Sequence, residues 1–139
     1  MNDPGAALAD AALAQIGCVF RLYGRDPATG LDCVGLVTNA LAKVGGHPVA
    51  PIGYGLRNIG VDQWLPLAQR SGLVLASGAI RTGDVLLIAF AYGQHHLAIA
   101  VDAVNVVHAH AGLRRVVLQP RDSDWHVHAK WRLAPSTES

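Results

Sequence analysis

The sequence predicts an α+β fold, with helices in the first part of the chain and an antiparallel sheet in the second. Apolar residues recur at helical spacing before residue 46, whereas short β-branched or apolar runs separated by turn residues follow from residue 84. Of the 139 residues, 51% are hydrophobic and only 15% are charged, which suits a packed core. Helices followed by strands are typical of α+β domains, and we expect residues 1–139 to form one domain.

The first predicted helix occupies the N-terminal segment. Pro4 suits its first turn after Asn2 or Asp3 as the cap, and Gly17 ends an apolar stripe made of Leu8, Ala12, Leu13 and Ile16. The segment lacks the basic start and continuous apolar stretch of a signal peptide. No apolar run reaches the roughly 18 residues of a membrane span. We therefore expect synthesis in the cytoplasm and no membrane insertion.

The second predicted helix begins at Cys33. Asp32 is a natural N-cap, Gly45-Gly46 is a stop signal, and the stripe between them consists of Cys33, Val37, Ala40, Leu41 and Val44. A cysteine in the first turn lies near the positive end of the helix dipole, so we expect its thiolate to be favoured. The Asp32 carboxylate opposes this shift unless capping occupies its oxygens.

Segments rich in Gly and Pro flank this helix. Residues 17–31 predict a loop that borders the Cys33 thiol, and residues 48–60 predict a connector. A short helix is expected over residues 61–69, although Pro66 limits it.

The second half predicts a sheet. The expected strands are Asp84–Phe90, His96–Val101, Asn105–His108 and Arg115–Leu118, followed by a closing strand from Trp125 to Trp131. We expect Asp84 to cap the turn before the first of these strands.

The register of one hairpin decides whether two histidines meet. If Val101 to Ala103 form a three-residue loop, residue 100 pairs with residue 104 and His96 stands opposite His108. Directly opposed residues have Cβ atoms about 4.5–5.5 Å apart, so one imidazole could orient the other. A two-residue loop would put the two side chains on opposite faces of the sheet.

These residues suit nucleophilic catalysis. His96 would take the thiol proton of Cys33 and later give it to the leaving amine, while His108 would hold the His96 ring in the useful tautomer. Cys33 would attack an amide carbonyl, and its backbone N–H plus one further donor would meet the oxyanion. His95 and His110 are expected at the edge of the cleft.

Charge and cysteine content exclude other classes. The formal net charge is +1, and no basic cluster is longer than Arg114-Arg115, so we expect no nucleic-acid partner. Two cysteines, Cys18 and Cys33, make a disulfide scaffold a poor explanation, and Cys18 is expected to be a buried thiol.

An ordered set of motifs resembles the NlpC family of papain-like cell-wall cysteine peptidases. The family's signature is Asp-Cys-Ser-Gly-Leu-Val, then Pro-Gly-Asp-Leu, His-Val-Gly-Ile and an Ile-His-Ala strand. The matching segments lie between Ile16 and Leu133 and are residues 17–21, 32–37, 81–85, 96–101 and 107–109.

The resemblance implies a papain-like fold and a catalytic triad of Cys33, His96 and His108, without a metal or other cofactor. It implies an amide bond in a peptidoglycan stem peptide as the substrate. Val34, in place of the family's serine, and the short form of the chain look most like the peptidases encoded with phage tails and gene-transfer particles. Such a protein would have phage-tail or particle proteins as partners, and it would be carried in a particle or released to act on the wall.

The oxyanion support departs from the family pattern. The family's Pro-Tyr-x-Trp-Gly segment carries a tyrosine hydroxyl, whereas the matching residue here is Phe20, with Val19 and Leu22 at the proline and tryptophan positions. A phenyl ring cannot donate a hydrogen bond, and losing one oxyanion donor costs about 2.7–4 kcal/mol of barrier stabilisation. Tyr23 is a candidate substitute.

Two other functions stay open. Phe20 is compatible with a weak or inactive module of the same fold that binds the wall or assembles a tail. Cysteine and two histidines are also zinc ligands, but the chain has no His-Glu-x-x-His motif and its single Glu is Glu138.

Overall fold

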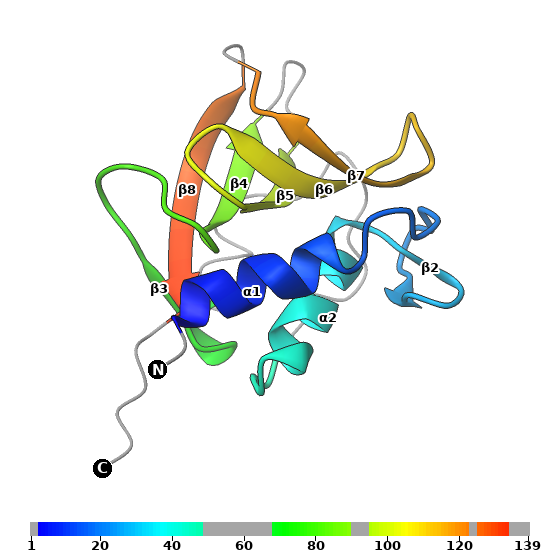
Figure 1. Cartoon of the computed structure of the whole chain (residues 1–139), viewed down its shortest axis with the longest axis horizontal. Helices are drawn as coiled ribbons and strands as arrows, with labels where there is room; N and C mark the ends of the chain where they lie inside the picture. The colour runs from blue at the N-terminus through cyan, green and yellow to red at the C-terminus, as the bar shows by residue number, and fades with distance from the viewer. Residues whose placement is uncertain (1–2, 49–67, 90–94, 123–124, 134–139) are drawn as a thin grey trace.

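The computed structural model describes residues 3–48, 68–89, 95–122 and 125–133, and it confirms the predicted α+β arrangement. Helices α1 (Pro4–Leu13) and α2 (Cys33–Lys43) precede a six-stranded antiparallel sheet. Figure 1 shows the two helices packed together on one side of this sheet. Among the described residues, no helix is long and apolar enough to cross a membrane.

The strands lie in the spatial order β3-β8-β4-β5-β6-β7. Their bounds are β3 (Leu73–Leu75), β4 (Val85–Ala89), β5 (His95–Ala100), β6 (Asn105–His110), β7 (Arg115–Pro120) and β8 (His126–Leu133). The predicted strands are therefore confirmed with small shifts at their ends. The sequence does not predict β3, because three residues are too few to establish a period. Nor does it predict the small hairpin of β1 (Arg25–Asp26) and β2 (Gly30–Leu31) inside the expected loop.

Both faces of the central strands are buried, which explains why their sequences are continuous apolar runs. One face packs against the helices through Leu87, Leu97, Ile99, Val107 and Trp131. The other face forms a second, smaller core of Leu86, Ile88, Ala98, Ala100 and Val106, bordered by Ile80, Trp125 and Val127. By the alternation of each strand, this second face is also the one that carries His96 and His108.

The N-terminal helix is shorter than predicted. Asp3 caps it by accepting a hydrogen bond from the Gly5 N–H at 3.0 Å, but the helix ends at Leu13 and Ile16 is 45% exposed. The chain turns there because the Gly17 N–H bonds to the Val116 carbonyl on β7, which draws the segment away from the helix axis.

The connector and short helix expected between residues 48 and 69 lie almost entirely outside the described residues. Within the described part, residues 68–70 form one helical turn that leads into β3.

Asp84 caps its turn as predicted and also forms an ion pair that the sequence does not predict. Its carboxylate accepts the Arg81 N–H at 2.9 Å and receives the Arg132 guanidinium on both oxygens, at 2.8 and 2.9 Å. Asp84 is fully buried. This pair joins the start of β4 to β8.

Candidate active site

The Cys33 thiol lies at the first residue of α2, as predicted. Asp32 adopts an extended conformation and accepts the Gly35 N–H at 2.8 Å, which confirms it as the N-cap. Cys33 itself is only 2% exposed. The thiol is therefore held at a helix start but is covered from bulk solvent. Both Cys33 and Cys18 are free thiols, and Cys18 is half-buried rather than fully buried.

Within the described part of the chain, the Asp32 carboxylate accepts hydrogen bonds from three donors. Besides Gly35, the Tyr23 N–H binds Oδ2 at 2.7 Å and the Arg25 guanidinium binds Oδ1 at 2.9 Å. Asp32 is fully buried. Its oxygens are thus occupied, and the small β1–β2 hairpin is tied to the helix start through Arg25.

Two glycines let the hairpin segment approach this helix. A Cβ on Gly35 would lie 1.9 Å from the Gly24 carbonyl oxygen, and a Cβ on Gly24 would lie 2.2 Å from the Gly30 carbonyl oxygen. Neither position can hold a larger residue without moving the backbone. Next to them, Tyr23 takes a left-handed φ of 64° at the place where the family pattern has glycine.

Burial keeps the thiol protonated. It raises the pKa of Cys33 to about 12, with the Asp32 charge adding to the rise, while backbone hydrogen bonds from Leu97 and Val34 and the Arg25 charge act in the opposite direction. The expectation that the thiolate is favoured is therefore wrong for this state of the protein, because desolvation outweighs the helix start. The hydrogen bond from Leu97 places the thiol against the backbone of β5, at the residue that follows His96 in the strand.

His96 and His108 are in direct contact. His96 Nε2 lies 2.8 Å from His108 Nδ1, and the ring planes meet at 81°. On the far side of the second ring, His108 Nε2 lies 2.7 Å from Gln119 Oε1. The structure thus brings the two predicted histidines together and adds a glutamine from β7, which the sequence analysis does not single out.

The hairpin register differs from the predicted one. Ala100 pairs with Val106 rather than with residue 104, and the Val101 N–H bonds to the Asn105 carbonyl, so the turn lies one residue later in the chain than expected. Extended along the strands, this register would put His96 opposite residue 110, and the imidazole pair is therefore diagonal. A shift of two residues preserves the face on which each side chain lies, which is why the histidines still meet.

Both imidazoles are neutral near pH 7. Burial, with smaller contributions in the same direction from His108 and His110, lowers the pKa of His96 to about 3. Burial also lowers the pKa of His108, whereas the hydrogen bond from His108 to Gln119 Oε1 raises it. A neutral imidazole has one N–H and one acceptor nitrogen, so it can serve as a base.

Aromatic rings surround the histidine pair. The His110 ring lies 5.3 Å from the His108 ring, and the Trp125 ring meets His108 edge-on at 5.6 Å. His110 accepts the Leu113 N–H at its Nδ1. His110 and His95 are both partly exposed, as expected of residues at a cleft edge.

Phe20 and Tyr23 differ in their surroundings. Phe20 is half-buried against the helix core, and its N–H bonds to the Arg114 carbonyl. Tyr23 is 50% exposed. Its role as an oxyanion donor stays a prediction.

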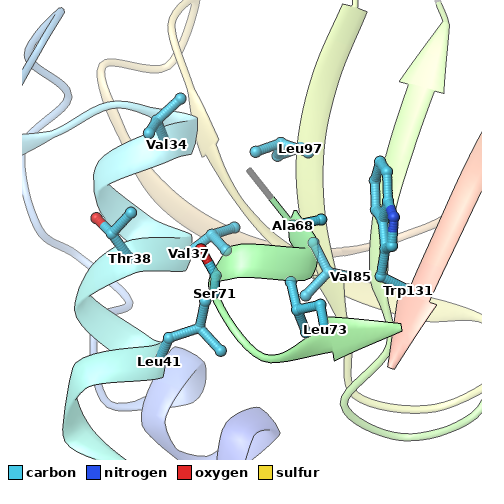
Figure 2. Close-up of a pocket in the computed structure, with 10 residues that line it drawn as sticks. All are labelled: Val34, Val37, Thr38, Leu41, Ala68, Ser71, Leu73, Val85, Leu97 and Trp131. Atoms are coloured by element: carbon cyan, nitrogen blue, oxygen red, sulfur yellow. The ribbon is translucent and has the colours of Figure 1, made fainter. Parts of the chain in front are cut away.

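An apolar cavity of about 30 Å³ lies beneath the helix start, between α2 and the sheet. Figure 2 shows Val34 and Leu97, the chain neighbours of Cys33 and His96, at one end of it, with Trp131 along one side. The cavity is too small for a substrate side chain. It belongs to the core on which the site is built.

The described residues do not form a metal-binding site. Within residues 3–48, 68–89, 95–122 and 125–133, no three His, Cys, Asp or Glu side chains are grouped in a way that could hold an ion.

No family model and no curated protein matches the chain. Solved structures do match. The NlpC/p60 domain of the peptidoglycan hydrolase SagA is 26% identical over 86% of this chain and 90% of that chain, with a TM-score of 0.56. NlpC2 from Trichomonas vaginalis is 17% identical, with a TM-score of 0.72, and the match covers 95% of this chain but 49% of that one.

A third neighbour is non-catalytic. RipD from Mycobacterium tuberculosis is described as a non-catalytic NlpC/p60 domain protein adapted to peptidoglycan binding. It is 18% identical over 96% of this chain and its own full length, with a TM-score of 0.60. The fold is that of NlpC/p60 domains, and these neighbours support the family resemblance.

Proposed function

We propose that the protein is a cysteine endopeptidase that hydrolyses an amide bond in peptidoglycan stem peptides. The observation that carries this proposal is the hydrogen-bonded pair of His96 and His108, together with a cysteine at a helix start whose thiol contacts the backbone of Leu97, the residue after His96. The match to a peptidoglycan hydrolase domain supports the substrate class. Cys33 is the nucleophile, His96 the general base and acid, and His108 the residue that orients His96.

The reaction proceeds in two halves. The Cys33 proton passes to His96 as the sulfur attacks the amide carbon, since a thiol with a pKa of about 12 holds no standing thiolate at neutral pH. The C–N bond then breaks, the amine leaves with the proton from His96, and a thioester remains. Water attacks the thioester with His96 again as the base, which releases the acid and restores the thiol.

The oxyanion of each tetrahedral intermediate needs donors. The Cys33 N–H at the start of α2 is one, because the first N–H groups of a helix have no partner within it. We propose the Tyr23 hydroxyl as the second donor, in place of the hydroxyl that Phe20 lacks.

Digestion of purified peptidoglycan tests the proposal. Mass analysis should detect new stem-peptide ends with the wild type and none with Cys33→Ala, and the ends identify the bond. Cys18→Ala, at the other free thiol, is the matched control and should remain active. Equal fragment patterns for wild type and Cys33→Ala would refute the peptidase.

A wall-binding module without catalysis is the second candidate. The covered, protonated thiol and Phe20 favour it, and RipD provides a neighbour of that kind. Co-sedimentation with insoluble peptidoglycan, unchanged by Cys33→Ala and unaccompanied by cleavage, is its expected outcome. Fragments joined to an added amine would instead identify acyl transfer by the same three residues.

Particle association is a finer proposal. It rests on Val34, which stands at the position of the family's serine. Detection of the chain in purified phage-like particles tests it, whereas a chain found free near the wall would contradict it.

A further inference from the structure

The hydrogen-bonded line of side chains does not end at His108. It continues to Gln119, whose Oε1 lies 2.7 Å from His108 Nε2. We propose that Gln119 is a positioning residue that fixes the proton positions on both imidazoles and so determines which nitrogen of His96 can act as the base. The catalytic consequence rests on the proposed function, but the effect on the imidazole protons does not.

The sheet places the three residues in a row. His96 is on β5, His108 on β6 and Gln119 on β7, which are neighbouring strands. Gln119 is opposite Val106, two residues before His108, so its side chain lies on the same face of the sheet as His108 and reaches it diagonally. Each of the two hydrogen bonds joins side chains on adjacent strands, so the arrangement of the three residues is determined by the register of the sheet.

The proton positions follow from the chemistry of the amide. Oε1 of Gln119 only accepts, so His108 Nε2 must donate. A neutral imidazole has one N–H, and His108 Nδ1 is then an acceptor, which requires His96 Nε2 to donate across the 2.8 Å contact. The proton of neutral His96 is thus on Nε2, and Nδ1 keeps the lone pair that a base needs.

Reversing the amide would reverse the whole row. If the Gln119 amide nitrogen faced His108, both rings would take the opposite tautomer and His96 Nδ1 would carry the proton. It could not then accept one from Cys33. The edge-on Trp125 ring, 5.6 Å from His108, restricts rotation of that imidazole and keeps the row intact.

Substitutions that differ in hydrogen-bonding capacity at position 119 test the proposal. Gln119→Glu keeps an acceptor, Gln119→Lys offers only donors, and Gln119→Leu offers neither. Gln69→Leu, at an exposed position, makes the same chemical change away from the row. Nitrogen-15 NMR of labelled histidines reports which ring nitrogen carries the proton, with signals assigned from His96→Gln and His108→Gln.

We expect Nε2–H tautomers for His96 and His108 in the wild type, in Gln119→Glu and in Gln69→Leu. Gln119→Leu should give mixed tautomers and Gln119→Lys the reversed ones. On peptidoglycan, kcat should fall about 10–100-fold in Gln119→Leu with little change in KM, as for other residues that orient a ligand or base. Gln119→Glu should retain most of kcat. The acidic limb of its pH profile should move to higher pH, because the negative charge of the glutamate favours protonated His108.

Unchanged tautomers in both Gln119→Leu and Gln119→Lys would overturn the proposal, as would equal losses of kcat in all three variants. Circular dichroism and thermal unfolding identify a variant that fails to fold. In that case the test is the comparison of the near-isosteric Gln119→Glu with the wild type, in tautomer and in pH profile. If the tautomers shift as expected in a protein that cuts no peptidoglycan, the proposed function fails and the role of Gln119 stands.

Discussion

Two fully buried aspartates, Asp32 and Asp84, occupy equivalent local positions and have different consequences. Each comes directly before an element, α2 or β4, each accepts a backbone N–H, and each pairs with an arginine. Arg132 binds both oxygens of Asp84, whereas Arg25 binds one oxygen of Asp32. The other oxygen of Asp32, Oδ2, accepts the Tyr23 N–H.

The difference lies in the residues on the C-terminal side of each aspartate. After Asp84 comes an apolar strand, so the ion pair only holds β4 to β8. After Asp32 comes Cys33, so the same kind of pair also acts on a thiol: the aspartate raises its pKa and Arg25 lowers it. The Asp84 carboxylate thus has a structural role, whereas the Asp32 carboxylate also influences the pKa of the proposed nucleophile.

Removing the Asp84 carboxylate should have the largest effect on stability. Asp84→Ala leaves the partly exposed Arg132 guanidinium and the Arg81 N–H without their acceptor, and the loss of these hydrogen bonds to a charged group costs about 1.5–3 kcal/mol of unfolding free energy. Urea denaturation measures this loss. Asp10→Ala, at an exposed position on α1, should change stability by less than about 0.5 kcal/mol. A loss below about 1 kcal/mol in Asp84→Ala would show that Arg132 finds another partner.

The stability of the fold should depend on pH through His96, whereas the Asp84 ion pair does not contribute to this dependence. The pKa of His96 is about 3 in the folded protein and 6.5 in its ordinary state, so between these values the unfolded chain binds a proton that the folded chain does not. Stability is therefore complete above about pH 6.5 and falls as the pH drops toward 3. The slope is about 1.4 kcal/mol per pH unit for one such group, or about 2 kcal/mol between pH 7 and pH 5.

His96→Gln should remove this part of the acid dependence, as measured by urea denaturation at the two pH values. Asp84→Ala, although less stable at both, should keep it. An unchanged slope in His96→Gln would mean that His96 already binds a proton in the folded state.

Asp32→Asn should affect reactivity more than stability. The amide oxygen can still cap α2, so we expect a loss of about 1–2 kcal/mol from the weakened contacts to Arg25 and Tyr23. Loss of the negative charge lowers the thiol pKa, so iodoacetamide should alkylate Cys33 faster than in the wild type at the same pH. Asp84→Asn is the matched control and should leave the alkylation rate unchanged. Slower alkylation in Asp32→Asn would show that the carboxylate mainly positions the thiol.

The sequence predicts the elements of this site better than their energetics. The N-cap at Asp32, the helix start at Cys33 and the meeting of His96 with His108 all follow from spacing and period, which are local properties. The register is predicted incorrectly by two residues, because the position of a hairpin turn depends on contacts such as that of Asp102 with the Asn105 N–H, which spacing does not specify. The shared face survives because a strand alternates with a period of two.

Other parts of the site depend on contacts between distant segments. The high pKa of Cys33 comes from burial at the start of a helix that packs against β5 and the β1–β2 hairpin, and no pattern around the cysteine indicates this packing. Gln119 is one polar residue in an edge strand, and only the pairing of β7 with β6 shows that it faces His108. Arg25 and Arg132 are likewise 7 and 48 residues from their aspartates.

The smallest effect should come from Tyr23, whose N–H completes the Asp32 arrangement. Its φ of 64° is costly for a residue with a Cβ, so Tyr23→Gly should stabilise the fold by about 1 kcal/mol or less while keeping the N–H bond to Asp32. Tyr23→Phe leaves the backbone as it is and removes only the hydroxyl. If that hydroxyl supports the oxyanion, Tyr23→Phe should lower kcat on peptidoglycan with little change in stability. An unchanged kcat would exclude Tyr23 from the oxyanion site, and the Cys33 N–H would then need a different second donor.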